Sequence, residues 1–301
     1  AQTIYLGFMK LLITGSNGLL GQKLIDLCVA KQLDFLATSS GANRYSICPK
    51  DKYQTLDITD EQNIQAVLES YQPTHVIHTA AMTNVDQCEL QPEACDLVNR
   101  QSVLMLAKFC QNHAIHLQLL STDFVFDGQD GPYRETDAPN PLSVYARSKV
   151  EAEKILQQTE GLSYSIVRTI IVYGQGEQLS RSNIILWAKE ALQKGSPLQI
   201  VNDQFRAPTW ADDLAWACVR ICELRQVGLF HIAGPEVLSI YEIVARVAAF
   251  YKLPMTQVAQ LSSETLQQPA KRPPRTGFIL DKAEELLGYH PHTLEQTFAL
   301  L

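Results

Sequence analysis

Two side chains in the middle of the sequence have the types and the spacing to transfer a proton together. Tyr145 and Lys149 lie four residues apart in the segment SVYARSK of residues 143–149. Residues at this spacing on a helix project from one face, so both heads can reach one ligand. A phenol has a pKa of about 10, and a neighbouring cation lowers it because the cation favours the phenolate. Lowering it to about 7 takes about 4 kcal/mol, which an ammonium group and hydrogen bonds in a dry site can supply.

A Tyr-x-x-x-Lys string is common, so its significance depends on a second feature, a glycine-rich turn. Residues 10–14 (KLLIT) form a nearly uninterrupted apolar run, as expected for a central parallel strand. Gly15, Gly18 and Gly21 follow at spacings of three, ahead of an apolar helical stripe. Gly15 would permit a sharp turn, Gly18 a close backbone approach and Gly21 tight helix packing, with the helix N-terminus facing a phosphate. The turn predicts a site for the pyrophosphate of a dinucleotide; the alternative is an ordinary glycine-rich loop.

Strands and helices alternate through the first half of the chain. The pattern predicts a long amphipathic helix over residues 92–113 and a further helix that carries Tyr145 and Lys149. This alternation is typical of an α/β fold with a doubly wound parallel sheet of the Rossmann type. The expected strands are residues 10–14, 34–38, 53–57, 75–79, 116–121 and 162–168.

Beyond about residue 170 the alternation weakens and prolines become frequent. We therefore expect a dinucleotide-binding domain over residues 9–170 and a smaller, mixed substrate-binding lobe over residues 171–301, with segments that could return to the main sheet. Residues 1–8 precede Met9 and are interpreted as a tag or a short extension, outside the fold argument.

Bulk composition narrows the function classes. The chain has 301 residues, 46% of them hydrophobic and 19% charged, which is typical of a globular enzyme. No apolar run approaches the roughly 18–20 residues of a membrane span, so no membrane partner is expected. The net charge of −7 argues against nucleic acid and anionic membranes as partners. A homodimer is compatible with these numbers.

The seven cysteines are an odd number, and none of them forms a Cys-x-x-Cys pair. They lie mostly in apolar helical segments, which predicts buried thiols in a reducing cytoplasm and neither disulfides nor a metal site.

The segment after the second strand bears on the choice of cofactor. In dinucleotide-binding folds an acidic residue here holds the adenosine ribose 2′-hydroxyl, whereas a cation can accept a 2′-phosphate. Residues 38–44 (TSSGANR) contain no carboxylate. The hydroxyl of Ser39 and the guanidinium of Arg44 suit a phosphate better than a bare ribose, so we favour NADPH over NADH. The alternative is that Arg44 points into solvent.

Two other strand ends carry candidate site residues. After the fourth strand, Ala80 and Ala81 would let the backbone pass close to a cofactor. Ser121 and Thr122 end the fifth strand, at the edge where such folds bind ligands. Thr122 could hydrogen-bond the substrate carbonyl that Tyr145 protonates; the alternative is ordinary turn chemistry.

Several separate motifs together resemble one enzyme family. They are the glycine turn, STDFVFDG at residues 121–128, Tyr145 with Lys149, RT and VYG at 168–174, DQFRAPT at 203–209, and RP with LDK near residues 272–282. In this order they resemble the dTDP-4-dehydrorhamnose reductases, in the extended branch of the short-chain dehydrogenase/reductases, over roughly residues 9–300.

The resemblance implies a role for individual residues. It makes Thr122, Tyr145 and Lys149 the catalytic trio and Asn99 the structural asparagine near the lysine. Asp57 would face the adenine amine, its alternative being a carboxylate at a helix start. The implied cofactor contacts are Gly15, Asn17, Gly18, Leu19, Leu20, Gly21, Ser39, Arg44, Asp57, Ile58, Ala80, Ala81, Thr83, Asn99, Tyr145 and Lys149. The implied substrate contacts are Asp86, Ser121, Thr122, Asp123, Phe124 and Arg206, and no metal site is expected.

The chain departs from the family pattern around the substrate. Phe124 stands where the family has tyrosine, Ile171 where it has tryptophan and Arg206 where it usually has glycine. The stretch before Asn183 lacks the usual glycine-rich form. The hydride chemistry is thus the firmer expectation, and the identity of the sugar the weaker one.

Three functions are compatible with these residues. The leading hypothesis is an NADPH-dependent reductase of the C4 ketone of a 4-keto-6-deoxy nucleotide sugar. The second is a non-catalytic regulatory subunit, because the methionine adenosyltransferase β subunit resembles the same family. The third is a nucleotide-sugar epimerase or dehydratase, which Asp123 beside Thr122 would allow but the missing acid after the second strand disfavours.

Overall fold

A seven-stranded parallel sheet forms the centre of the protein. The computed structural model describes residues 9–301, so the interpretation of residues 1–8 concerns residues outside the described part. The strand order is β11-β6-β5-β4-β1-β2-β3, and all neighbouring pairs are parallel. The strands are β1 (Lys10–Thr14), β2 (Asp34–Ser39), β3 (Tyr53–Thr55), β4 (His75–His78), β5 (His116–Thr122), β6 (Tyr164–Thr169) and β11 (Gly228–His231). The predicted fold class is confirmed.

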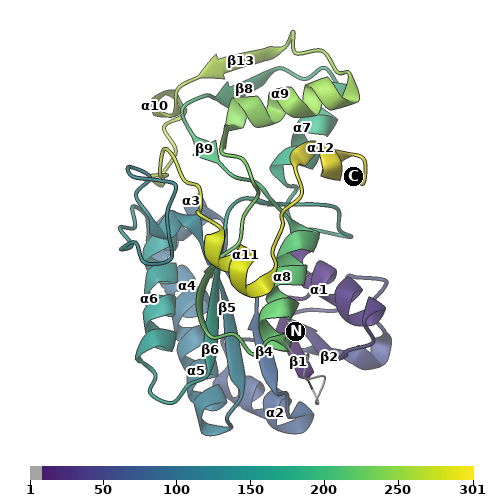
Figure 1. Ribbon diagram of the computed structural model, residues 1–301, viewed down its shortest axis with the longest axis vertical. Helices are drawn as coiled ribbons and strands as arrows, with labels where there is room; N and C mark the ends of the chain where they lie inside the picture. Colours follow the sequence, from purple (N-terminus) through teal and green to yellow (C-terminus); the bar gives the residue numbers. More distant parts are fainter. Residues whose placement is uncertain (1–8) are drawn as a thin grey trace.

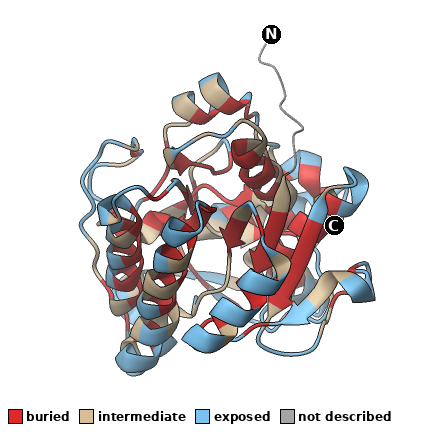
Figure 2. Ribbon diagram, turned by 90° about the horizontal axis from the view of Figure 1, so that it is seen from below, coloured by how far each residue is buried: buried red, intermediate tan, exposed pale blue. Residues whose placement is uncertain are grey.

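Helices cover both faces of this sheet, which explains why its strands are apolar on both sides (Figures 1 and 2). In β1, Leu11 and Ile13 face one layer, while Leu12 between them faces the other, and all three are fully buried. The first layer contains α1 (Leu19–Ala30), α8 (Ala211–Glu223) and α11 (Asp281–Leu287). The second contains α2 (Glu61–Tyr71), α5 (Ser102–Asn112) and α6 (Val144–Gln158).

A smaller lobe forms the upper part of the molecule in Figure 1 and has its own apolar core. Its three sheets have two strands each, β7 with β10, β9 with β12, and β8 with β13. Its strands are β7 (Val172–Tyr173), β8 (Leu198–Val201), β9 (Phe205–Arg206), β10 (Thr209–Trp210), β12 (Leu238–Ser239) and β13 (Val258–Leu261). Its helices are α7 (Ile184–Gln193), α9 (Ile240–Tyr251), α10 (Ser263–Leu266) and α12 (Leu294–Phe298).

Three elements that follow residue 171 pack on the main sheet and not in the lobe. Helix α8 packs against α1, and β11 pairs with β6 in the register Gly228 with Ser165. Helix α11 contributes Ala283 and Leu287 to the core beneath α1. The chain therefore crosses from the main sheet into the lobe and back again.

The sequence located the first six strands to within two residues at each end. The helix predicted over residues 92–113 is different in detail. It consists of α4 (Pro92–Asp96), a π-helical segment (Leu97–Gln101) and α5, preceded by the short α3 (Val85–Leu90). The prediction that the seven cysteines are buried is confirmed. Among residues 9–301, no helix has the length and apolarity needed to cross a membrane.

Candidate active site

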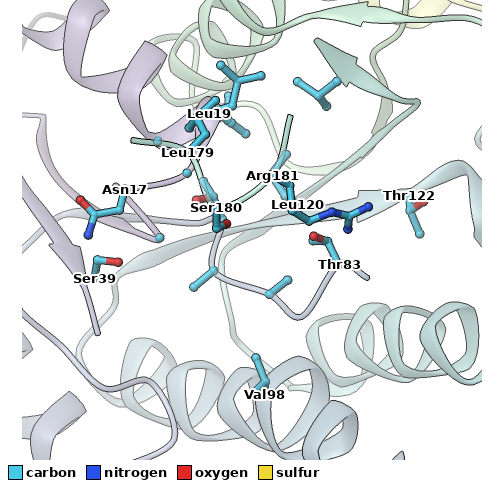
Figure 3. Close-up of a pocket in the computed structure, with 18 of the residues that line it drawn as sticks. Asn17, Leu19, Ser39, Thr83, Val98, Leu120, Thr122, Leu179, Ser180 and Arg181 are labelled. Atoms are coloured by element: carbon cyan, nitrogen blue, oxygen red, sulfur yellow. The ribbon is translucent and has the colours of Figure 1, made fainter. Parts of the chain in front are cut away.

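A cavity of about 790 Å³ lies where the C-terminal ends of the central strands meet the smaller lobe (Figure 3). This is the edge at which doubly wound sheets bind ligands. The structure brings most of the predicted site residues to its walls: Gly15, Asn17, Gly18, Leu19, Leu20, Gly21, Ser39, Arg44, Asp57, Ile58, Ala80, Ala81, Thr83, Ser121, Thr122, Asp123, Tyr145 and Lys149. Four predicted residues do not line it: Asp86, Asn99, Phe124 and Arg206.

The glycine turn has the geometry that its spacing predicts. Gly15 has a φ of +68°, and a Cβ there would lie 2.7 Å from the backbone nitrogen of Ala80. A Cβ on Gly21 would lie 2.5 Å from the carbonyl oxygen of Gly15, so α1 could not approach the turn with a larger residue. Gly18 is less crowded, with its nearest neighbour at 3.2 Å, and it borders the cavity. Side chains larger than glycine would fill the space above this turn. The space and the N-terminus of α1 beside it fit a dinucleotide pyrophosphate.

Asn17 ties this turn to the loop after β2. Its side-chain oxygen accepts a 2.9 Å hydrogen bond from the backbone nitrogen of Arg44, and its amide nitrogen donates to the carbonyl of Ala42 at 2.9 Å. Ser39 and Arg44 both line the same end of the cavity. This end therefore presents a hydroxyl and a cation, the donor set that a 2′-phosphate requires.

Asp57 borders the same end of the cavity but is engaged in its own turn. Its carboxylate accepts hydrogen bonds from the backbone nitrogen and the hydroxyl of Thr59, at 2.8 and 2.7 Å. These hydrogen bonds hold the pKa of the Asp57 carboxyl below its usual value. The helix that follows, α2, is capped by Asp60, so Asp57 is not its cap.

Tyr145 and Lys149 lie in the first turns of α6, which begins after the capping residue Ser143. Both side chains are buried and line the cavity with Thr122. Burial raises the pKa of Tyr145, and a hydrogen bond with Thr122 lowers it only in part. The expected lowering of this pKa by Lys149 is not found: loss of solvation is the largest effect, and the nearby Asp123 carboxylate raises the pKa further.

Burial lowers the pKa of Lys149 to about 8, although the negative charge of Glu153 opposes this shift. Glu153 lies one helical turn further along α6 and is itself held by Arg168, at 2.6 Å, and by the Ser121 hydroxyl. Below about pH 8, Lys149 is an ammonium group in the cavity wall. It can bind hydroxyl groups of a ribose and stabilise negative charge on a nearby phenol.

Asn99 was predicted to contact the cofactor, but it lies behind the cavity wall. The π-helical segment directs its side chain toward the loop after β4, where its oxygen accepts from the backbone nitrogen of Met82 at 2.8 Å. Its amide nitrogen donates to the Met82 carbonyl and to the Ser148 hydroxyl, each at 3.0 Å. Asn99 thus joins this loop to α6 between Tyr145 and Lys149, and supports the site without lining it.

Asp123 and Arg206 form a buried ion pair beside Thr122. Arg206 also lies over the ring of Phe124, 5.2 Å from its centroid, and donates to the carbonyls of Phe205 and Pro273 at 2.7 Å each. Burial raises the pKa of the Asp123 carboxyl, and the charge of Arg206 opposes this. Only Asp123 of this cluster lines the cavity: Arg206 is buried, and Phe124 lies edge-on to the ring of Tyr145, with 6.2 Å between the centroids.

Asp86 was also predicted to bind substrate, but in the structure its carboxylate forms an ion pair. Both of its oxygens accept from the guanidinium of Arg272, at 3.0 and 2.8 Å, and one also accepts from the backbone nitrogen of Ala270. This ion pair joins the segment around Arg272, which returns from the lobe, to helix α3.

The stretch before Asn183 was placed near the substrate from the sequence, but none of its residues was named as a contact, and the loop of residues 179–183 lines the cavity. Among residues 179–183, Arg181 is the one that carries a charge. Asn183, which caps α7, followed by an apolar stretch, is a recognisable helix start. That signal locates the loop in the sequence but does not show that it folds over the cavity.

Known proteins resemble this chain over nearly its whole length. A family model described as the RmlD substrate binding domain matches residues 9–300. The methionine adenosyltransferase 2 subunit beta of Danio rerio is 30% identical over 293 residues, which are 95% of this chain and 87% of that protein. The dTDP-4-dehydrorhamnose reductase of Aggregatibacter actinomycetemcomitans is 30% identical over 296 residues, 94% of each chain. A crystal structure of a dTDP-4-dehydrorhamnose reductase from Clostridium acetobutylicum has a TM-score of 0.83 at 27% identity and covers 96% of this chain and 97% of that one.

Proposed function

Because the chain belongs to the family of the RmlD substrate binding domain, we propose that it is an NADPH-dependent oxidoreductase acting on a nucleotide sugar. Its reaction is the reduction of the C4 ketone of a 4-keto-6-deoxy nucleotide sugar. The observation that carries this proposal is that Thr122, Tyr145 and Lys149 line one cavity together with the glycine turn and Arg44. The relatives named dTDP-4-dehydrorhamnose reductase support it.

The cofactor would be held at one end of the cavity. The turn around Gly15 and Gly18 would receive the pyrophosphate, while Ser39 and Arg44 would receive the 2′-phosphate of the adenosine ribose. Bound NADPH would supply the hydride for the ketone. Lys149 would hold the nicotinamide ribose.

Each catalytic side chain then has one task. The Tyr145 phenol is protonated at neutral pH because its pKa is raised, so it carries the proton that the forming alkoxide oxygen needs. Lys149 is charged below about pH 8 and stabilises the phenolate that remains after this transfer. The Thr122 hydroxyl, which donates to Asp123 in the structure, would turn its proton to the substrate oxygen and hold that oxygen beside the phenol.

Two other functions are kept as alternatives. A non-catalytic regulatory subunit is favoured by the relatives named methionine adenosyltransferase 2 subunit beta. A nucleotide-sugar epimerase or dehydratase is favoured by Asp123, whose raised pKa would suit an acid beside Thr122. The ion pair with Arg206 counts against this role, because it occupies the carboxylate. A cytoplasmic location, which suits the seven buried thiols, and a homodimer stay predictions.

An assay with NADPH and several 4-keto-6-deoxy nucleotide sugars tests the proposal, with oxidation followed at the nicotinamide absorbance band. We expect turnover with at least one sugar and none with the matching sugar that lacks the ketone. Binding of NADPH without oxidation of any sugar would favour the regulatory subunit. Conversion of a sugar without net consumption of NADPH would favour the epimerase or dehydratase.

A further inference from the structure

The loop of residues 179–183 presents an unpaired cation to the end of the cavity where Thr122 lies. Arg181 lines the cavity, and Figure 3 shows its guanidinium pointing to the side on which Thr83 and Thr122 lie, opposite to Asn17 and Ser39. Within residues 9–301, the Arg181 guanidinium makes no hydrogen bond or ion pair with another side chain or with the backbone.

The carboxylates on this side of the cavity already have partners. Asp86, whose pKa the charge of Arg181 helps to lower, is bound at both oxygens by Arg272. Asp123 is paired with Arg206 and accepts a hydrogen bond from Thr276. The positive charge of Arg181 therefore has no carboxylate partner here, although the chain as a whole has a net charge of −7. An anionic ligand would balance it.

The loop that carries Arg181 is fixed at both of its ends. Gln22 on α1 accepts from the backbone nitrogen of Glu177 and donates to its carbonyl, both at 2.8 Å. Asn183 donates to the carbonyl of Gly174 at 2.7 Å and caps α7. Arg181 is therefore held near the cavity mouth before any ligand arrives, which reduces the entropy cost of using it.

We propose that Arg181 binds the diphosphate of the nucleotide-sugar substrate. The inference rests on the proposed function, and it identifies the part of the substrate that this chain recognises by charge. A diphosphate offers several acceptor oxygens to the fork of donors on a guanidinium. The cofactor phosphates would have other places, near Asn17 of the glycine turn and near Ser39, which Figure 3 shows on the opposite side of the cavity from the Arg181 guanidinium. The N-terminus of α7 begins beside the loop and adds a favourable partial charge for the same anion.

Calorimetric titration of dTDP into the full-length protein saturated with NADPH tests this proposal, with the variants Arg181→Ala and Arg181→Lys. We expect Arg181→Ala to weaken dTDP binding about tenfold to a hundredfold, since a hydrogen bond to a charged group is worth about 1.5–3 kcal/mol. Arg181→Lys should be intermediate, because it keeps the charge but loses the fork. Lys154→Ala is the matched control: it removes the same charge from an exposed pair with Glu151 on α6.

The outcomes separate this inference from the proposed function. An unchanged dTDP affinity in Arg181→Ala overturns the inference, even where the unaltered protein reduces a 4-keto sugar. A loss of NADPH affinity in this variant, with dTDP affinity intact, also overturns it and makes Arg181 a cofactor ligand. If the unaltered protein binds dTDP but oxidises no NADPH with any sugar, the proposed reaction fails, while a weaker dTDP affinity in Arg181→Ala still supports the diphosphate site. A protein that binds no dTDP at all overturns the inference, and the assay with the other nucleotide sugars then decides the proposed reaction.

Discussion

The Asp123 carboxylate lies 3.8 Å from the guanidinium Nε of Arg206, and these side chains are only 3% and 2% exposed. Asp123 directly follows Thr122, and its carboxylate accepts a 3.2 Å hydrogen bond from the Thr122 hydroxyl. The Thr122 hydroxyl is therefore positioned by a buried ion pair that joins the main sheet to β9 of the smaller lobe.

Replacing Arg206 by methionine should destabilise the fold, because the Asp123 carboxylate would stay buried without its cation. Breaking a buried pair on one side costs about 3–5 kcal/mol. Chemical denaturation measures this as a lower free energy of unfolding. Arg134→Met is the control, since its pair with Asp281 is largely exposed and should contribute less than about 1 kcal/mol. Equal losses in the two variants would contradict the assigned role of the pair.

Tyr145→Phe should reduce turnover by at least about 10²-fold, because general-acid catalysis contributes about 10²–10⁴-fold. NADPH affinity, measured by fluorescence titration, should be nearly unchanged, since only a hydroxyl is removed from the cavity wall. Near-normal turnover in this variant would rule out Tyr145 as the proton donor.

Lys149→Met should change how stability depends on pH. Burial lowers the pKa of Lys149 from 10.5 to about 8, so the unfolded chain binds a proton that the folded protein has released between these values. Stability of the unaltered protein should then rise between pH 8 and 10.5 by about 1.36 kcal/mol per pH unit relative to the variant. Denaturation curves at pH 7.5, 9 and 10 give the two slopes. If the free energy of unfolding changed with pH equally in both proteins, the pKa of Lys149 would be the same in the folded and unfolded chains.

Arg44→Ala should weaken NADPH more than NADH, because only NADPH carries the 2′-phosphate. The loss of one charge-assisted hydrogen bond, about 1.5–3 kcal/mol, corresponds to a fall in the NADPH preference of about one to two powers of ten. Titrating both cofactors into both proteins measures the preference directly. The same affinity for NADH and NADPH in the unaltered protein would show that Arg44 does not meet the phosphate.

Local sequence signals were sufficient where a residue's role depends on its immediate neighbours. The spacing of Gly15, Gly18 and Gly21 predicted the turn, since Gly18 and Gly21 meet backbone of their own segment and Gly15 has the positive φ of a sharp turn. The i,i+4 spacing of Tyr145 and Lys149 likewise predicted a shared helix face. These features need no knowledge of how distant segments pack.

Local signals failed where the role depends on a partner far along the chain. Asp86 was expected at the substrate, but its partner Arg272 lies 186 residues later. Arg206 was expected there too, yet it pairs with Asp123 across the boundary between the sheet and the lobe. Asn99 lies in a π-helical segment that helical periodicity does not reveal, and it bonds Met82 and Ser148 away from the cavity lining. In each case the sequence indicated what the side chain can bind, but tertiary contacts decide which partner it faces.

The return of the chain to the main sheet through α8, β11 and α11 bears on how this protein folds. The edge strand β11 pairs with β6, and α8 packs against α1, some 190 residues away in the sequence. A fragment that ends near residue 170 would lack these partners and would expose the apolar faces of α1 and β6. We therefore expect the sheet and the lobe to unfold in one cooperative transition, with slow refolding because loops of this length must close before the sheet is complete.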